Sequence, residues 1–284
     1  MQPDSYGAKS SSRKDRRRGR FGGWAAAGLA LALAAATACS SVTSRPIPAP
    51  GTPGKPYISL AGRVDGIDVW VVDGQYVRER LDEEFTNFGQ HYNFPFIPVH
   101  EFWLDRERTP GETGYFIDHL LLEYKLMANG ISYGTALELG DGVELAERKH
   151  SALGREGETL AAAHDRAGLL ARIHKQPLAE YGTGVTVWVV DGELVRDVLF
   201  IDFTEGGHDK VYAFVPPREV WLDDDLMPEE RRFVLLHELY ERRLMSKGWT
   251  YPRAHHAASA IEFRCRRRPE LLDAALKAEI EANR

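Results

Sequence analysis

The chain has 284 residues, of which 42 are acidic and 36 basic, and its formal net charge is −6 at pH 7. The first 38 residues hold seven of the basic residues and two of the acidic ones, so the remainder is more acidic, at −11. Because this excess of negative charge opposes contact with a phosphate backbone, we expect no nucleic acid partner.

Residues 1–38 have the composition of an export signal peptide. A basic run ending at Arg20 precedes an apolar stretch from Trp24 to Ala36, which is short for a membrane-spanning helix. Residues 36–39 (Ala-Thr-Ala-Cys) resemble the lipobox of bacterial lipoproteins, in which the cysteine is lipidated. The resemblance implies an exported protein held at the membrane of the bacterial cell envelope by a lipid on Cys39. A conventional secretory signal, cut near the same place, is the alternative.

Residues 39–59 are predicted to form an extended tether, because the stretch from Ser41 to Lys55 contains four prolines and two glycines. Cysteine occurs at two positions, 39 and 265. With Cys39 acylated, Cys265 has no partner, and we expect no disulfide.

The sequence beyond the tether contains two similar copies of one segment. Residues 66–74 (GIDVWVVDG) recur as residues 184–192 (GVTVWVVDG), an offset of 118 that holds without a gap to the end of the copy. We interpret this as a tandem duplication, with residues 60–147 as the first repeat, 148–180 as a partly helical connector and 181–284 as the second repeat. Further matches at this offset are Phe85 with Phe203, Trp103 with Trp221, Leu126 with Leu244 and Tyr133 with Tyr251.

The second repeat begins with a β-rich half. We predict strands at residues 185–190, 195–203, 211–215 and 219–222, with turns at Asp191-Gly192, as in a hairpin, and at Gly206-Gly207. The tryptophans Trp70, Trp103, Trp188 and Trp221 are expected in the core or between the copies. The acidic run 223–225 is a candidate calcium site. Alternatively, it lies on the solvated surface, where its negative charge interacts favourably with the dipole of the following helix.

A helical half follows. Pro228 opens one helix, which Gly248 ends, Thr250 caps a second helix over residues 251–267, and Pro269 opens a last one to Asn283. In the first repeat, Gly140 and Gly142 are predicted to interrupt the helix that faces His119. The fold class is α+β, in which each repeat is a small, mostly antiparallel sheet followed by a helix pair.

The two central helices of the second repeat carry ionisable residues on their buried sides. His237 and Glu241 lie one turn apart, and His255 and Glu262 lie two turns apart on the next helix. Burying unpaired charges costs several kcal/mol, and a shared divalent metal ion would remove that cost. We therefore predict a metal site formed by His237 and Glu241, with His255 or Glu262 as the third ligand.

Residues 237–241 (His-Glu-Leu-Tyr-Glu) resemble the His-Glu-x-x-His helix of the zincin peptidases and, together with Glu262, the gluzincins in particular. The resemblance implies a zinc-dependent hydrolase, a peptidase or amidase acting on an unknown envelope substrate. It assigns His237 as a ligand, Glu238 as the general base and Glu262 as the downstream glutamate ligand. Glu241 stands where the family has its second histidine, and His255 is a histidine that can replace it.

The first repeat lacks part of this set. Leu120 and Leu137 stand opposite Glu238 and His255, whereas His119, Glu123 and Glu144 match His237, Glu241 and Glu262. The first repeat is thus expected to be a degenerate partner that packs against the second or presents substrate to it. His208, whose counterpart is Gln90, is a further candidate contact to a substrate or a metal.

Two alternatives remain open. The histidine and glutamate pairs are also explained as packing contacts between helices, with Arg242 and Arg243 neutralising Glu238 and Glu262. The protein is then a non-catalytic binding or structural lipoprotein of the cell envelope. A phosphohydrolase site with magnesium is less favoured, because histidine ligands suit zinc better.

Overall fold

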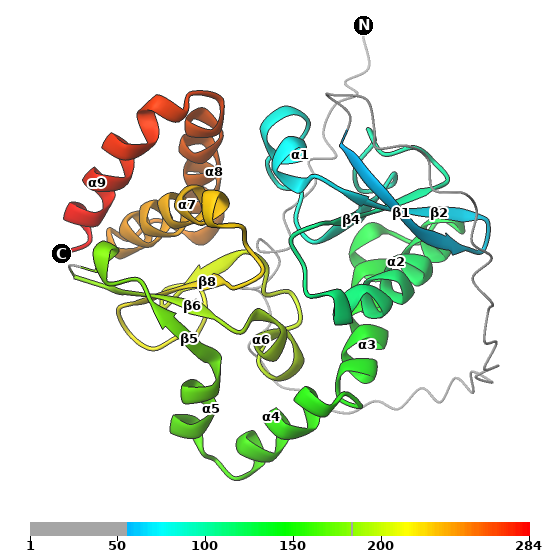
Figure 1. The fold of residues 1–284 in the computed structure, drawn as a ribbon, viewed down its shortest axis with the longest axis horizontal. Coiled ribbons are helices and arrows are strands. Elements are labelled where there is room, and N and C mark those ends of the chain that lie inside the picture. Colours follow the sequence, from blue (N-terminus) through cyan, green and yellow to red (C-terminus); the bar gives the residue numbers. More distant parts are fainter. Residues whose placement is uncertain (1–55, 183) are drawn as a thin grey trace, which may run out of the picture.

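The computed structural model describes residues 56–182 and 184–284, so the predicted signal peptide, Cys39 and most of the tether lie outside the described residues. Two four-stranded sheets, each followed by helices, make up the described chain, as the α+β prediction requires (Figure 1). We refer to residues 56–148 as the N-terminal unit and to residues 149–284 as the C-terminal unit. None of the helices in these ranges is long and apolar enough to cross a membrane.

The two sheets have the same strand arrangement. In the N-terminal unit, the order is β1 (Tyr57–Val64), β2 (Ile67–Val72), β4 (Glu101–Asp105) and β3 (Phe88–Gln90). In the C-terminal unit, it is β5 (His174–Pro177), β6 (Thr186–Val190), β8 (Glu219–Asp223) and β7 (Gly206–His208). The outer pairings are antiparallel, as predicted for most of the sheet, but the central pairs β2–β4 and β6–β8 are parallel.

The predicted hairpin at Asp191-Gly192 is wrong, and so is the return strand at residues 195–203. A short helix, α6 (Gly192–Val198), follows β6, and Asp191 caps it by accepting a hydrogen bond from the Leu194 amide at 3.0 Å. A Cβ at position 192 would lie 2.2 Å from the Asp223 carboxylate, which explains the glycine. The helical crossover allows β8 to pair in parallel with β6. Helix α1 (Gly74–Arg80) occupies the same place in the N-terminal unit.

The segment between β7 and β8 also differs from the prediction. Gly206 and Gly207 lie in β7 rather than in a turn, and residues 211–215 form turns rather than a strand. Gly207 leaves room for the ring of Tyr212, which a Cβ there would approach to 2.2 Å. Tyr212 and Val215 are buried in the core around Trp221, so the apolar run of this segment reflects loop packing. The predicted strand at 219–222 is present as β8.

The helices agree closely with the prediction. Helix α7 (Pro228–Ser246) is followed by Gly248, which has a φ of +86° and ends the helical path, and then by α8 (Tyr251–Arg267). A 3-10 turn at Pro269–Leu271 precedes α9 (Leu272–Ala282), so the last helix starts later than expected. Their counterparts are α2 (Thr113–Ala128) and α3 (Tyr133–Arg148). The predicted interruption at Gly140 and Gly142 is wrong, since both lie inside α3. Gly140 instead leaves room for the His119 ring, which a Cβ there would approach to 2.8 Å.

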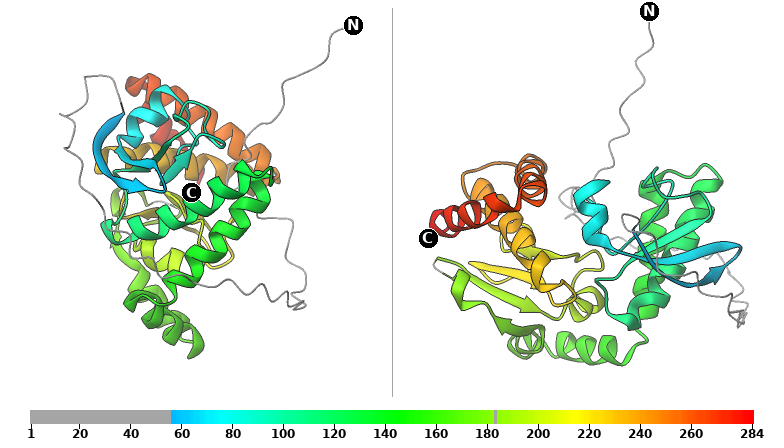
Figure 2. Two further views of the ribbon diagram at one scale, coloured as in Figure 1. Left: turned by 90° about the vertical axis from the view of Figure 1, so that its right-hand side faces the viewer. Right: turned by 45° about the horizontal axis from the view of Figure 1, so that its top comes forward.

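The connector is mostly helical. Helices α4 (Ala152–Ala162) and α5 (Arg166–Ile173) run along one side of the molecule from the end of α3 to β5 (Figure 2). Strand β5 joins the second sheet, so the last residues of the predicted connector belong to the C-terminal unit. Two tryptophans, Trp103 and Trp221, are buried in the cores of their own units, and Trp70 and Trp188 pack against the same cores.

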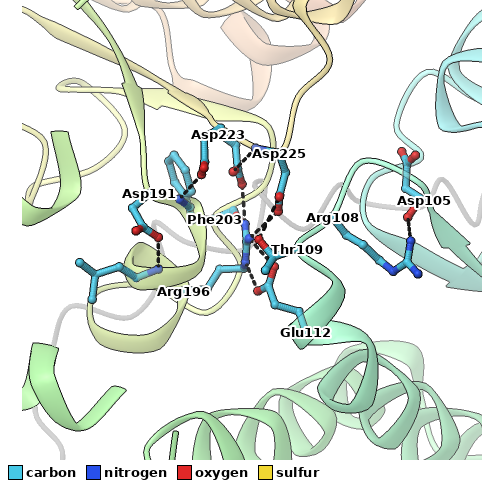
Figure 3. A network of polar contacts seen from close by, with 12 residues as sticks. Asp105, Arg108, Thr109, Glu112, Asp191, Arg196, Phe203, Asp223 and Asp225 are labelled. Carbon is cyan, nitrogen blue, oxygen red and sulfur yellow. Dashed lines mark hydrogen bonds and ion pairs between the residues drawn. The ribbon is translucent and has the colours of Figure 1, made fainter. Parts of the chain in front are cut away.

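Reciprocal buried ion pairs join the two units. Arg196 of α6 binds Glu112 of the N-terminal unit at 2.6 Å and Asp223 of its own unit at 2.5 Å (Figure 3). Asp223 is buried at this contact, whereas Asp224 and Asp225 are half-buried, so the acidic run 223–225 is only in part the solvated surface that the sequence suggested. The corresponding contacts of Arg78, which lies 118 residues earlier, are to Glu230 at 2.9 Å and Asp105 at 2.7 Å. Buried ion pairs of this kind add little net stability, because the cost of removing the charges from water offsets much of their attraction.

Candidate metal centre

The ionisable residues singled out in α7 and α8 lie together between these two helices. His237 and Glu241 project from α7, and His255 and Glu262 project from α8. Each has an exposed fraction of 6 % or less. Ionisable groups this deeply buried need partners.

Three side chains converge on one point. Nε2 of His237 lies 3.0 Å from Nδ1 of His255 and 3.6 Å from Oε2 of Glu241, and Nδ1 of His255 lies 2.9 Å from the same oxygen. In a tetrahedral zinc site with bonds of 2.0 to 2.2 Å, ligand atoms are separated by about 3.3 Å. The triangle formed by His237, Glu241 and His255 therefore has the dimensions of such a site.

Glu262 lies on the other side of the His237 ring. Its Oε2 is 2.7 Å from Nδ1 of His237, and its Oε1 accepts a hydrogen bond from Arg266 at 2.9 Å. A carboxylate in this position keeps the hydrogen on Nδ1 and leaves the lone pair of Nε2 facing the convergence point. The geometry gives Glu262 the place of an orienting residue behind the histidine and His255 the place of a ligand.

Glu84, which sequence reasoning missed, holds His255 in the same way. Its Oε2 lies 3.3 Å from Nε2 of His255, and its Oε1 accepts a hydrogen bond from Ser259 at 2.8 Å. Glu84 comes from the N-terminal unit, 171 residues before His255. The residue 118 positions later, Asp202 of the C-terminal unit, is also acidic, so a comparison of the two units gives no signal at this position.

His208 contacts the outer oxygen of Glu241. The ring is fully buried, with Nε2 placed 3.0 Å from Oε1 of Glu241 and Nδ1 accepting the Lys210 amide hydrogen at 3.1 Å. Because Nδ1 is an acceptor, the hydrogen of the neutral ring is on Nε2. This tautomer has no free lone pair for a metal, so the structure favours His208 as a group that orients Glu241.

Glu238 is buried beside this group, with an exposed fraction of 2 %. Ligand atoms of Glu238, His208 and Glu241 lie within 4.8 Å of one another. Arg242 hydrogen-bonds to Asp209 and Asn283, and Arg243 to Glu279. The hydrogen bonds of Arg242 and Arg243 thus go to other partners, which does not support the expectation that these two arginines neutralise Glu238 and Glu262.

The surroundings of His237 favour a positive charge. Burial disfavours its imidazolium form, but hydrogen bonds to Glu241 and Glu262 outweigh burial and raise the pKa of His237 to about 10. Burial alone would raise the pKa of Glu262, but Arg266 and His237 lower it to about 2. A proton or a metal cation meets this demand for positive charge.

The matching position in the N-terminal unit keeps the outer contacts but not the second imidazole. Nδ1 of His119 lies 2.8 Å from Glu144, and Gln90 donates a hydrogen bond to Glu123 at 2.7 Å. Leu137 occupies the position of His255. Asp141 also approaches His119, at 3.6 Å, but Arg148 already binds Glu144 at 2.8 Å. Because position 137 is a leucine, the group around His119 has no second imidazole at the position of His255.

No model of a known protein family, no curated protein and no solved structure matches this chain.

Proposed function

We propose that the C-terminal unit binds zinc through His237, Glu241 and His255 and hydrolyses a peptide or amide bond in the bacterial cell envelope. The convergence of the three ligand atoms is the observation that carries the proposal. Two imidazole lone pairs that face each other at 3.0 Å repel unless a proton or a cation lies between them. Two nitrogens and one carboxylate oxygen form a ligand set typical of catalytic zinc.

The proposed chemistry is metal-assisted hydrolysis. A zinc ion held by His237, Glu241 and His255 would lower the pKa of a water molecule that it binds. Glu238, next to His237 in sequence and close to the Glu241 carboxylate, would be the residue to accept a proton there. Glu262 and Glu84 hold the two histidines in the tautomers that ligation needs. Compared with the gluzincins, His255 rather than Glu262 is the third ligand of this proposal.

The two units are proposed to be tandem repeats, of which the second is catalytic. Support comes from the identical offset of 118 residues in sheet pairing, in the interface arginines and in the helix pairs. The N-terminal unit, with Leu120 and Leu137 at the positions of Glu238 and His255, then serves as a partner without a complete ligand set.

A non-catalytic envelope lipoprotein is the second candidate function. The observation in its favour is the 2.8 Å contact between His119 and Glu144, because a histidine and carboxylate pair occurs there without a second imidazole. In this case a proton on His237 or His255 would satisfy the buried carboxylates.

Metal content distinguishes the two functions. After expression in zinc-containing medium and extensive dialysis, the mature protein is expected to retain a stoichiometric amount of zinc by elemental mass spectrometry. Prolonged treatment with a strong chelator should remove the zinc, and added zinc should restore it. Mature protein that binds no zinc, manganese or iron at neutral pH would contradict the metal site and leave the non-catalytic function.

The proposed membrane anchor has its own test. Cys39→Ser is expected to prevent lipidation, and the protein should then stay unprocessed or move from the detergent phase to the aqueous phase after Triton X-114 extraction. Cys265→Ser is the control. Because Cys265 lies in the buried core, its substitution should leave partitioning unchanged. Cys39→Ser protein of mature size that partitions as the wild type does would rule out the lipoprotein interpretation, and aqueous partitioning of both proteins would favour a conventional secretory signal.

A further inference from the structure

The loop between α1 and β3 of the N-terminal unit lies against α8 of the C-terminal unit. Glu84, in this loop, accepts a hydrogen bond from Ser259 with one oxygen, at 2.8 Å, and contacts Nε2 of His255 with the other, at 3.3 Å. Both oxygens of the carboxylate are therefore directed at the other unit. The side chain of Glu84 is 29 % exposed, whereas that of His255 is 7 % exposed, so Glu84 covers the outer side of the histidine.

Phe85, which follows Glu84, is linked to the C-terminal unit through Arg78. Phe85 is fully buried in the N-terminal core, and its carbonyl oxygen accepts a hydrogen bond from Arg78 at 3.3 Å. Arg78 also binds Glu230 at the start of α7, and Glu230 in turn binds Arg266 at 2.6 Å. Arg266 is the residue that holds Glu262 behind His237, so one polar network joins the base of the loop to both helices of the candidate metal centre.

His255 and Ser259 are specific to the second copy, whereas a carboxylate is present at the position of Glu84 in both copies. His255 and Ser259 have Leu137 and Asp141 as counterparts, and Glu84 has Asp202. A contact of Asp202 with the counterpart of His255 would meet a leucine, which cannot donate a hydrogen bond. A contact between a carboxylate and an imidazole is therefore possible for Glu84, because position 255 is a histidine and position 137 is a leucine.

We propose that the metal centre is shared between the units, with Glu84 of the N-terminal unit as a positioning residue for the ligand His255. This inference rests on the proposed zinc site. By accepting the hydrogen of Nε2, Glu84 keeps the lone pair of His255 on Nδ1, where His237 and Glu241 converge. The N-terminal unit, although it lacks a complete ligand set, then contributes to zinc affinity in the other unit.

The test compares Glu84→Gln with Asp202→Asn in the full mature chain. Both replace a carboxylate by an amide of the same shape at matching positions of the two units. Zinc affinity, measured by competition with a chromogenic chelator, should fall about tenfold to a hundredfold in Glu84→Gln, as for other residues that orient a metal ligand. Asp202→Asn should keep wild-type affinity. The visible spectrum of the cobalt-substituted protein should also change in Glu84→Gln alone, because His255 would no longer be held in one orientation.

A second variant covers the case in which Glu84→Gln does not fold. Ser259→Ala removes one hydrogen bond to Glu84 but retains its charge, and a smaller loss of zinc affinity is expected. Wild-type affinity in both Glu84→Gln and Ser259→Ala would overturn the shared centre while leaving the zinc site intact. An equal loss in Asp202→Asn would also overturn it, since the effect would not be specific to the contact with His255. Wild-type protein without zinc would instead overturn the proposed function, and with it this inference.

Discussion

His237→Ala and Glu241→Ala are each expected to strip the metal from the C-terminal unit. Each removes one of the three atoms that lie 2.9 to 3.6 Å apart, and two remaining ligands cannot hold the ion against dialysis. The loss of affinity should exceed the roughly hundredfold upper end found for orienting residues. Elemental analysis of dialysed protein measures the result directly.

The chain supplies its own controls for this experiment. His119→Ala and Glu123→Ala change the matching residues of the N-terminal unit and should leave the metal content unchanged. Circular dichroism of each variant identifies losses that come from unfolding. Metal retained by folded His237→Ala, or lost from folded His119→Ala, would place the ion elsewhere.

The third ligand is decided by the same measurement. His255→Ala should behave like His237→Ala, because Nδ1 of His255 is one of the converging atoms. Glu262→Gln should only weaken binding, by about tenfold to a hundredfold, because Glu262 contacts the far nitrogen of His237. Loss of the metal in Glu262→Gln but only weakened binding in His255→Ala would instead indicate that Glu262 is the third ligand, as in the gluzincins.

The helical half of the C-terminal unit could be predicted from the sequence because its signals are local. Proline at the first turn of α7 and glycine after its last turn mark boundaries that hold regardless of what packs nearby. The 3.6-residue period then places His237 and Glu241 on one face. Once the helices are correct, the meeting of α7 and α8 brings His255 to the same point.

The strands were harder to predict because the same residues serve two local structures. An Asp-Gly pair is typical of a hairpin turn, but aspartate is also a favoured helix cap, and Asp191 caps α6. The choice depends on Asp223, which lies against Gly192 and is 31 positions further along the chain. Likewise, the apolar residues around Tyr212 suggest a strand, although they fill the core from a loop.

The outer residues of the site were the least predictable from sequence. Glu84 reaches His255 from another unit, across 171 residues, and no periodic pattern connects positions so far apart. His208 was identified as a candidate contact, but its tautomer depends on the backbone amide of Lys210. Ligand types and helix faces were therefore accessible from sequence, whereas the contacts that orient the ligands required the three-dimensional arrangement.

Glu238→Gln is expected to separate catalysis from metal binding. The substitution keeps the size of the side chain but removes its ability to accept a proton at neutral pH. If Glu238 takes the proton of the attacking water, the rate should fall about a hundredfold or more, whereas zinc content stays near the wild-type value because Glu238 is outside the converging triangle. The measurement is kcat on the best substrate from a screen of peptides, amides and esters.

Glu123→Gln is the control for this substitution, because it makes the same change at a buried glutamate of the N-terminal unit and should leave the rate unchanged. If the role of Glu238 is purely structural, Glu238→Gln should lower the midpoint of thermal unfolding, and kcat of the folded fraction should be retained. Full hydrolytic activity in Glu238→Gln would refute the proposed base even with zinc bound.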